Sequence, residues 1–169
     1  GLVSASRLAE VEASMMTLNR AARDVVVAHD VHAVTDVTGF GLLGHLVEMA
    51  AGSDTCVMLD ADAPALFEGT RELARLGVIP AGAYRNRHFA EARCDLAGVP
   101  LDLADALFSP ETSGGLCVAV APDDADALLS DLAAREGVPC AVRLGEVVAA
   151  DGSGVRVVAR SQEGSGRDA

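Results

Sequence analysis

The chain has 169 residues, with 13 basic and 25 acidic side chains and therefore a formal net charge of −12. All 13 basic residues are arginines, so there is no lysine for a phosphate-binding P-loop or a Schiff-base mechanism. The acidic balance and the scarcity of aromatic residues argue against nucleic-acid binding. Hydrophobic residues make up 50% of the chain, enough for one domain that buries about 70% of its unfolded surface.

The sequence favours a cytoplasmic protein that does not enter a membrane. No segment reaches the ~20 consecutive apolar residues of a membrane-spanning helix, and residues 1–10 lack the features of a secretion signal. We expect residues 1–159 to form a single domain and residues 160–169, rich in glycine, serine and charge, to form a frayed tail. The four cysteines lack the spacing of a zinc site and are expected to be inert buried thiols: Cys56, Cys94, Cys117 and Cys140.

The first predicted element is a long helix over residues 8–25, whose apolar residues recur every three or four positions. Ser4 or Ser6 can cap this helix. We expect it to pack across the domain's own sheet, and a short coiled coil is the alternative.

Residues 32–60 predict a strand, helix, strand unit of the kind that needs a crossover connection. Its parts are a strand over residues 32–37, a glycine-rich turn, a helix that ends at Gly52, and a strand over residues 55–60.

The second half of the chain predicts another unit of this kind. The remaining predicted elements are a helix over residues 64–76, a loop over 78–100 with a short helix near 88–93, a helix over 101–108, a strand over 116–121, a helix from Pro122, a strand or strand pair over 138–149, and a strand over 155–158. These elements predict an α+β fold with a mixed β-sheet of four or more strands covered by helices, distantly ferredoxin-like.

The most informative segment runs from Thr35 to His45. It places Asp36 at the end of a predicted strand, directly before the glycine-rich turn into a helix. Glycines let the backbone approach a ligand, amides at a helix start favour an anion, and a carboxylate offers hard oxygen to an accompanying cation. A magnesium nucleotide suits this combination. The alternative is that Asp36 or Thr38 only caps the helix, as in many proteins that bind no ligand.

A second segment, residues 109–116, leaves a predicted helix and enters a strand through Gly114 and Gly115. The hydroxyls of Thr112 and Ser113 are able to donate to a phosphate. Taken alone, however, these residues favour the alternative of a tight connection into a buried strand.

Taken together and in this order, these segments resemble the carboxy-terminal domain of the selenophosphate synthetase family. Its superfamily includes aminoimidazole ribonucleotide synthetase and the hydrogenase-maturation dehydratase. The resemblance is most specific at residues 32–45 and also covers residues 14–22, 46–51, 77–86, 109–116 and 145–147. It implies a fold like the aminoimidazole ribonucleotide synthetase C-terminal domain.

The resemblance also implies a function. Enzymes of this family convert selenide, ATP and water into selenophosphate, AMP and phosphate, with Mg²⁺ bridging the nucleotide, and the protein is expected to form a homodimer. The aspartate of the family's motif is a magnesium ligand, which implies that role for Asp36. No catalytic residue and no ATP contact transfers, and Ser109 stands where the family often has an acidic residue.

The family's amino-terminal half has no counterpart in these 169 residues. That half carries a reactive cysteine or selenocysteine, its partner lysine and the remaining magnesium carboxylates. We therefore expect this amino-terminal domain as a partner and expect the chain alone to be inactive. The rival readings are a sister ATP-dependent synthetase of the hydrogenase-maturation or purine type, and a non-catalytic binding or dimerisation module.

Other polar residues give weaker indications. His45 lies one turn into the motif helix, where it can orient Asp36 or a neighbouring loop. The planar guanidinium groups of Arg85 and Arg87 suit phosphate, although exposure to solvent is the more typical role. The histidines are too dispersed to predict a metal cluster: His29, His32, His45 and His88.

Overall fold

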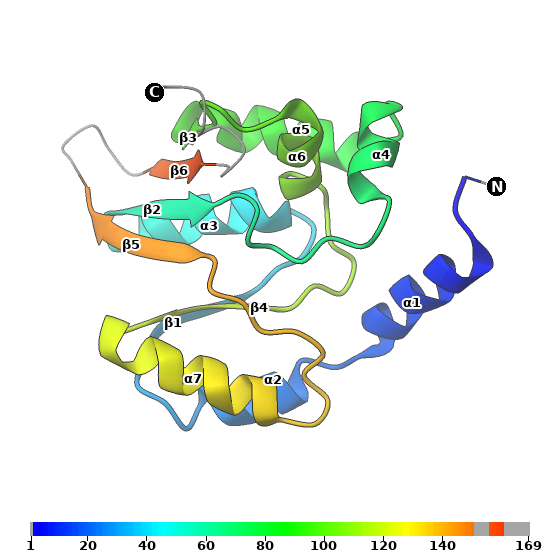
Figure 1. Ribbon diagram of the computed structural model, residues 1–169. Coiled ribbons are helices and arrows are strands. Elements are labelled where there is room, and N and C mark those ends of the chain that lie inside the picture. Colours follow the sequence, from blue (N-terminus) through cyan, green and yellow to red (C-terminus); the bar gives the residue numbers. More distant parts are fainter. Residues whose placement is uncertain (1, 151–155, 161–169) are drawn as a thin grey trace, which may run out of the picture. The chain divides into compact units, whose positions relative to one another are not determined.

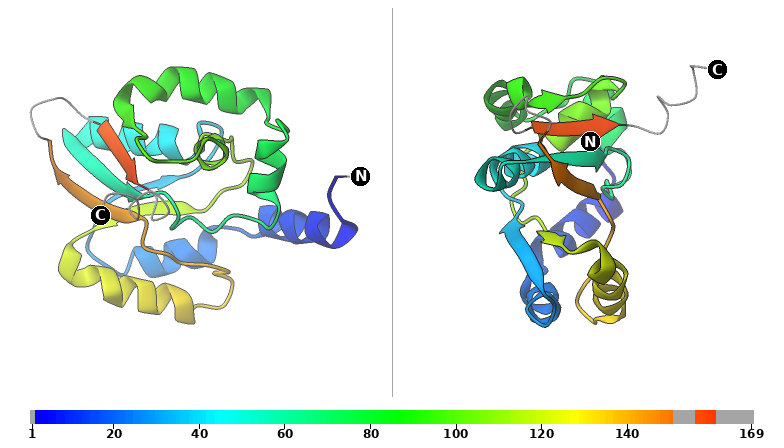
Figure 2. Two further views of the ribbon diagram at one scale, coloured as in Figure 1. Left: turned by 45° about the horizontal axis from the view of Figure 1, so that its top comes forward. Right: turned by 90° about the vertical axis from the view of Figure 1, so that its left-hand side faces the viewer.

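The computed structural model describes residues 2–150 and 156–160 (Figures 1 and 2). The chain divides into two compact units, one of Gly1–Val37 with Thr112–Arg143 and one of Thr38–Glu111 with Leu144–Ala169. That these units fold together as the single expected domain stays a prediction. Arg160 ends a strand, and the rest of the expected tail, residues 161–169, lies outside the described residues. Within the described ranges, no helix has the length and apolar character needed to cross a membrane.

The first unit is built on a two-stranded antiparallel sheet. Its elements are α1 (Ala5–Met16), α2 (Arg20–Val26), β1 (Val31–Asp36), β4 (Leu116–Val120) and α7 (Pro122–Ala134). Helices α2 and α7 lie side by side, as both figures show. Proline suits the first position of α7, and Asp123 and Asp124 place negative charge at the positive end of the helix. The buried apolar residues of this unit are Val26, Val37, Cys117 and Leu128.

The single long helix predicted over residues 8–25 is wrong, because the structure has two helices there. Thr17 has an extended backbone, and its hydroxyl donates to the carbonyl of Ala13 at 2.9 Å. The Asn19 amide then donates to the carbonyl of Gly114 at 2.9 Å. These polar contacts end α1 and direct the chain into α2, although the apolar repeat continues across the break.

Helix α1 confirms its predicted cap but not its predicted packing. The backbone N–H of Arg7 donates to Oγ of Ser4 at 3.3 Å. No residue of α1 is buried, and Leu8 and Met15 are 54% and 42% exposed. Both figures show α1 extending away from α2 and α7. The expected packing of this helix across the unit's own sheet is therefore wrong.

The second unit contains the mixed four-stranded sheet. Its elements are α3 (Gly41–Ser53), β2 (Thr55–Asp60), α4 (Thr70–Arg75), α5 (Ala81–Ala90), the 3₁₀-helix η1 (Glu91–Arg93), β3 (Cys94–Asp95), α6 (Leu101–Leu107), β5 (Gly145–Ala149) and β6 (Arg156–Arg160). The strand order is β3-β6-β2-β5, with β6 parallel to both of its neighbours and β5 antiparallel to β2. This confirms the predicted α+β class with a mixed sheet of four strands.

The core of the second unit forms where α3 covers β2 and β6 (Figure 1). Leu43 and Val47 of α3 are almost fully buried, and so is Leu59 of β2. Helix α3 runs to Ser53 rather than ending at Gly52, and Asp54 provides the left-handed residue, with φ 51°.

The predicted strand, helix, strand units do not form crossovers within one sheet. Strands β1 and β2 belong to separate sheets, and so do β4 and β5. An apolar run indicates a strand but not its partner. Strand β1 pairs with the distant β4 instead of β2.

Helix α4 is shorter than predicted. It begins at Thr70 and not near Pro64, because Gly69 has φ 88° and a left-handed residue interrupts a right-handed helix. The predicted strand or strand pair over residues 138–149 is likewise shorter, because only β5, from Gly145 to Ala149, is extended and paired.

The loop predicted over residues 78–100 is wrong, since α5, η1 and β3 occupy most of it. The buried residues of α5 are Ala83, Asn86 and Ala90, which share one helical face. Two small residues and an amide do not produce the repeat of large apolar side chains by which helices are found in a sequence.

Helix α6 is held to its neighbours by ion pairs. Nε of Arg71 in α4 lies 2.7 Å from Oδ2 of Asp102, and Nη2 of Arg75 lies 3.0 Å from the same oxygen. On the α5 side, Nη2 of Arg87 lies 2.8 Å from Oδ1 of Asp105. Asp102 is buried, and the hydrogen bond from Arg71 lowers the pKa of its carboxyl.

We expect Asp102→Asn to lower the free energy of unfolding at pH 7 by about 1–2 kcal/mol, since Arg75 is half exposed and solvent screens its share. The pKa of Asp102 is lower in the folded chain than its ordinary value of about 3.9. The stabilisation is therefore present above the ordinary value and is lost as the pH falls through the folded value. Urea unfolding at a series of pH values measures this.

The matched control is Glu72→Gln, which removes an exposed carboxylate from α4 and is expected to change stability by less than about 0.5 kcal/mol. If the difference in the free energy of unfolding between Asp102→Asn and the wild type grows below pH 4, the ion-pair explanation is contradicted.

Candidate functional site

Asp36 is the last residue of β1, and its side chain is exposed. The next residue, Val37, is buried, and its N–H donates to the carbonyl of Gly115 at 2.9 Å. In the β1–β4 pairing, Asp36 lies opposite Leu116. Within the first unit, Asp36 and Val37 of the first sequence segment therefore lie beside Gly115 and Leu116 of the second.

The turn after Asp36 belongs to the second unit, where it also meets the second sequence segment. The carbonyl of Thr38 accepts hydrogen bonds from the N–H of Gly41 at 3.0 Å and from the N–H of Glu111 at 2.9 Å. Burial raises the pKa of the Glu111 carboxyl above its ordinary value. The two segments singled out in the sequence are thus joined by backbone hydrogen bonds within each unit.

Gly41 is required where the turn enters α3. Its φ is 69°, in the region that favours glycine. A Cβ at this position would lie 2.7 Å from the carbonyl oxygen of Ser109 and 2.8 Å from that of Phe108. The glycine therefore lets the start of α3 approach the chain at the end of α6.

Asn86 is a site residue that the sequence reasoning missed. Its side chain is buried, and Nδ2 donates to the carbonyl of Gly39 and to the carbonyl of Phe108, both at 2.9 Å. The amide joins the glycine turn to the end of α6 from a third element, α5. The indication in the sequence was that this amide lies on the same helical face as Ala83 and Ala90.

The two arginines that flank Asn86 have different surroundings. Arg85 is exposed, which agrees with the solvent-facing role favoured for it. Arg87 pairs with Asp105, and its guanidinium lies 5.3 Å from the centre of the Phe108 ring.

The histidines do not form a metal cluster. His45 is buried, and its Nε2 accepts from the N–H of Thr38, in the turn just before α3, at 3.0 Å. His32 and His88 are exposed. Across the described part of the chain, no group of three or more His, Cys, Asp or Glu side chains is placed to hold a metal ion.

Burial lowers the reactivity of two of the four cysteines, Cys94 and Cys117. Cys56 and Cys117 are buried as expected, Cys94 is half-buried, and Cys140 is exposed, unlike the expectation for all four. Burial raises the pKa of the Cys94 thiol to about 11 and also raises the pKa of Cys117. Both thiols are protonated at neutral pH and are poor nucleophiles in that form.

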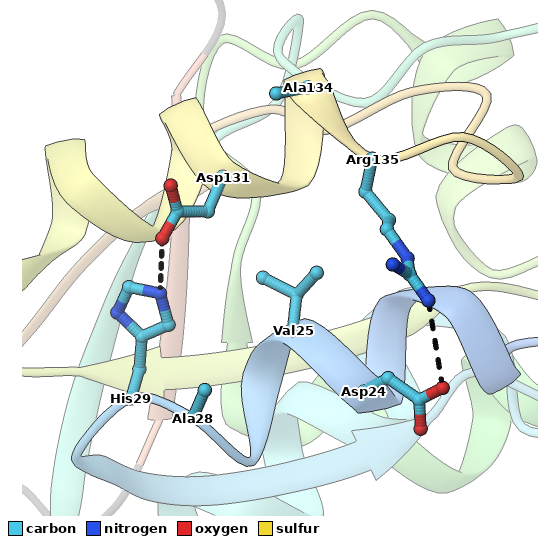
Figure 3. Close-up of a pocket in the computed structure, with 7 residues that line it drawn as sticks. All are labelled: Asp24, Val25, Ala28, His29, Asp131, Ala134 and Arg135. Atoms are coloured by element: carbon cyan, nitrogen blue, oxygen red, sulfur yellow. Dashed lines mark hydrogen bonds and ion pairs between the residues drawn. The ribbon is translucent and has the colours of Figure 1, made fainter.

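A pocket of about 350 Å³ lies between α2 and α7 (Figure 3). Its polar side chains are paired with one another: His29 Nε2 lies 3.0 Å from Asp131 Oδ2, and Arg135 Nη2 lies 3.8 Å from Asp24 Oδ2. The lining residues are Asp24, Val25, Ala28, His29, Asp131, Ala134 and Arg135. None belongs to the two sequence segments, so the pocket adds nothing to the Asp36 site.

Comparison with known proteins agrees with the fold and the sequence segments. The family model for AIR synthase related protein, C-terminal domain, matches residues 2–158. The chain is 42% identical over 127 residues to the selenide, water dikinase of Treponema denticola, covering 75% of this chain and 36% of that protein. It is 45% identical over 150 residues to the selenide, water dikinase of Pelobacter propionicus, covering 88% of this chain and 42% of that protein.

A solved structure of the hydrogenase maturation protein HypE in complex with ATP has a TM-score of 0.55 and 20% identity, covering 87% of this chain and 38% of that one. This likeness shows the fold alone. The chain spans less than half the length of each of these proteins.

We expect Gly41→Ala to lower the free energy of unfolding by at least about 1–2 kcal/mol, because alanine is strained at this φ and its Cβ meets two backbone carbonyls. Urea unfolding of the 169-residue chain measures the effect. The matched control is Gly39→Ala in the same turn, where a Cβ meets nothing within 4 Å, and its expected effect is below about 1 kcal/mol. Equal losses in the two variants contradict the packing explanation.

Proposed function

The chain belongs to the family of AIR synthase related proteins, through their C-terminal domain, and we propose that it is the carboxy-terminal domain of a selenide, water dikinase. The identities of 42% and 45% with proteins of that name support the proposal. The complete enzyme converts selenide, ATP and water into selenophosphate, AMP and phosphate. The 169 residues supply one part of the magnesium-ATP site and a scaffold.

The observation that carries this proposal is the exposed carboxylate of Asp36, at the end of β1 and directly before a turn fixed by hydrogen bonds. Mg²⁺ prefers oxygen ligands, keeps several waters, and is usually held by one or two carboxylates together with phosphate oxygens. A single accessible aspartate therefore fits as one ligand of this ion. A buried carboxylate facing away from solvent would not fit.

Asp36 acts by position and charge. Its carboxylate holds the cation against the polyphosphate and takes no proton from the substrate. When bound, Mg²⁺ offsets the negative charge that phosphoryl transfer places on the polyphosphate oxygens. The chain itself, with a net charge of −12, repels ATP in the absence of cations, which accords with binding that depends on magnesium.

The complete protein also needs groups that the 169 residues do not supply, since they contain no lysine. We propose that an amino-terminal domain provides the reactive cysteine or selenocysteine, a lysine and the other magnesium carboxylates. The exposed apolar side chains of Leu8, Met15 and Leu18 support the presence of a covering partner. From the family resemblance, we propose a cytoplasmic homodimer.

Two other functions compete with this one. A sister ATP-dependent synthetase is the first; the likeness to HypE, at 20% identity, shows a shared fold and no shared function, whereas the identity to one of the dikinases is 45%. A non-catalytic binding module would retain the fold without the magnesium site. A reactive cysteine or selenocysteine near a lysine, encoded upstream in the reading frame, favours selenium chemistry over the sister synthetase.

In the complete polypeptide that contains residues 1–169, we expect Asp36→Asn to lower selenide-dependent turnover of MgATP at least about tenfold and to raise the magnesium requirement. Thermal unfolding should change little, because the side chain is exposed. The control is Asp30→Asn, an exposed aspartate just before the other end of β1, for which normal turnover is expected. Normal kinetics for Asp36→Asn would falsify the assignment of this residue.

We expect the 169-residue chain by itself to release no phosphate from MgATP, with or without selenide. The reason is that one carboxylate cannot complete the metal site. Phosphate release and formation of labelled selenophosphate measure this. Magnesium-dependent turnover by the chain alone would disprove the need for an amino-terminal domain.

A further inference from the structure

The backbone N–H of Thr38 determines which nitrogen of the His45 ring is the hydrogen-bond acceptor. A backbone N–H can only donate, and this one lies 3.0 Å from Nε2 of His45. Nε2 must therefore be unprotonated and accept the hydrogen bond. The hydroxyl of Thr38 lies 3.1 Å from the same nitrogen and is placed to donate to it as well.

The carboxylate of Glu48 lies on the other side of the ring. Nδ1 of His45 lies 3.3 Å from Oε2 of Glu48, one turn further along α3. Because Nε2 is the acceptor, Nδ1 carries the proton and lies on the side of the ring that faces this carboxylate. His45 is only 8% exposed, and the edge of its ring contacts Phe40, with ring centres 5.8 Å apart. The ring therefore has one orientation and one tautomer.

This ring completes the hydrogen bonding of the Thr38 backbone. The carbonyl of Thr38 is already bonded to Gly41 and Glu111, and its N–H goes to His45. Asp36 is two residues upstream, so its Cα is at most about 7–8 Å from that of Thr38.

We propose that His45, which lies beside Glu48, is a positioning residue that fixes the turn directly after Asp36 through its bond to the N–H of Thr38. The inference rests on the proposed function, because it gives His45 a role in magnesium binding through Asp36. In this role His45 acts through Thr38 and is not itself a magnesium ligand. Displacements of about 1 Å in a reacting site lower rates by as much as ~100-fold, so loss of this bond has a measurable effect.

The test compares His45→Gln with His45→Asn in the complete polypeptide that contains residues 1–169. Both replacement side chains are uncharged amides, so the two variants are matched in their expected effect on stability. The glutamine amide reaches the position of Nε2 and can accept from Thr38, whereas asparagine reaches only as far as Nδ1. The variants thus differ in the hydrogen bond under test.

Two measurements are made on each variant. The first is hydrogen exchange of the Thr38 amide by NMR without nucleotide, and the second is the magnesium concentration that gives half-maximal phosphate release from ATP. We expect the glutamine variant to stay within about threefold of the wild type in both. For His45→Asn, we expect amide exchange at least about tenfold faster and a magnesium requirement raised about 10–100-fold.

Each outcome decides between the two proposals. Equal amide exchange or an equal magnesium requirement in the glutamine and asparagine variants overturns the inference about His45. If Asp36→Asn raises the magnesium requirement and His45→Asn does not, only the inference about His45 fails. If Asp36→Asn leaves turnover unchanged, the proposed function of Asp36 fails, whatever the exchange of Thr38 shows.

Discussion

The turn that follows Asp36 depends on the hydrogen bonds of one residue, Thr38. Its carbonyl accepts from Gly41 and Glu111, and its N–H donates to His45. Buried backbone groups without partners are unfavourable, so each bond restricts the positions that the turn can take. The start of α3, the interior of α3 and the segment after α6 all converge on this residue. Three hydrogen bonds from its surroundings therefore hold the turn.

The same turn is supported from α5 and α6 by contacts that are specific in shape. Asn86 places its amide between the carbonyls of Gly39 and Phe108, and Gly41 leaves room for the chain to pass. The ion pairs of Asp102 and Asp105 join α6 to α4 and α5. The second unit thus combines an apolar core under α3 with a polar set of contacts around the turn.

The sequence predicted those parts of the fold in which large apolar residues recur with a regular period. Helices α3, α6 and α7 and strands β2 and β4 have such patterns, and the structure has them at nearly the expected residues. Helix α5 was missed because its buried face consists of Ala83, Asn86 and Ala90. Asp36 and the glycine turn were evident as a motif. The bonds from His45 and Asn86 were not, because they join residues whose proximity only the fold creates, and the pairing of β1 with β4 was hidden for the same reason.

The chain passes between the two compact units three times, at residues 37/38, 111/112 and 143/144. Neither unit is a continuous stretch of sequence, so no single cleavage releases one intact, and neither can be transferred to another gene as a cassette. The motif itself is divided by the first passage, with Asp36 on one side and Thr38 on the other. A shortened version of this protein that keeps both units therefore has to keep all three connections between them.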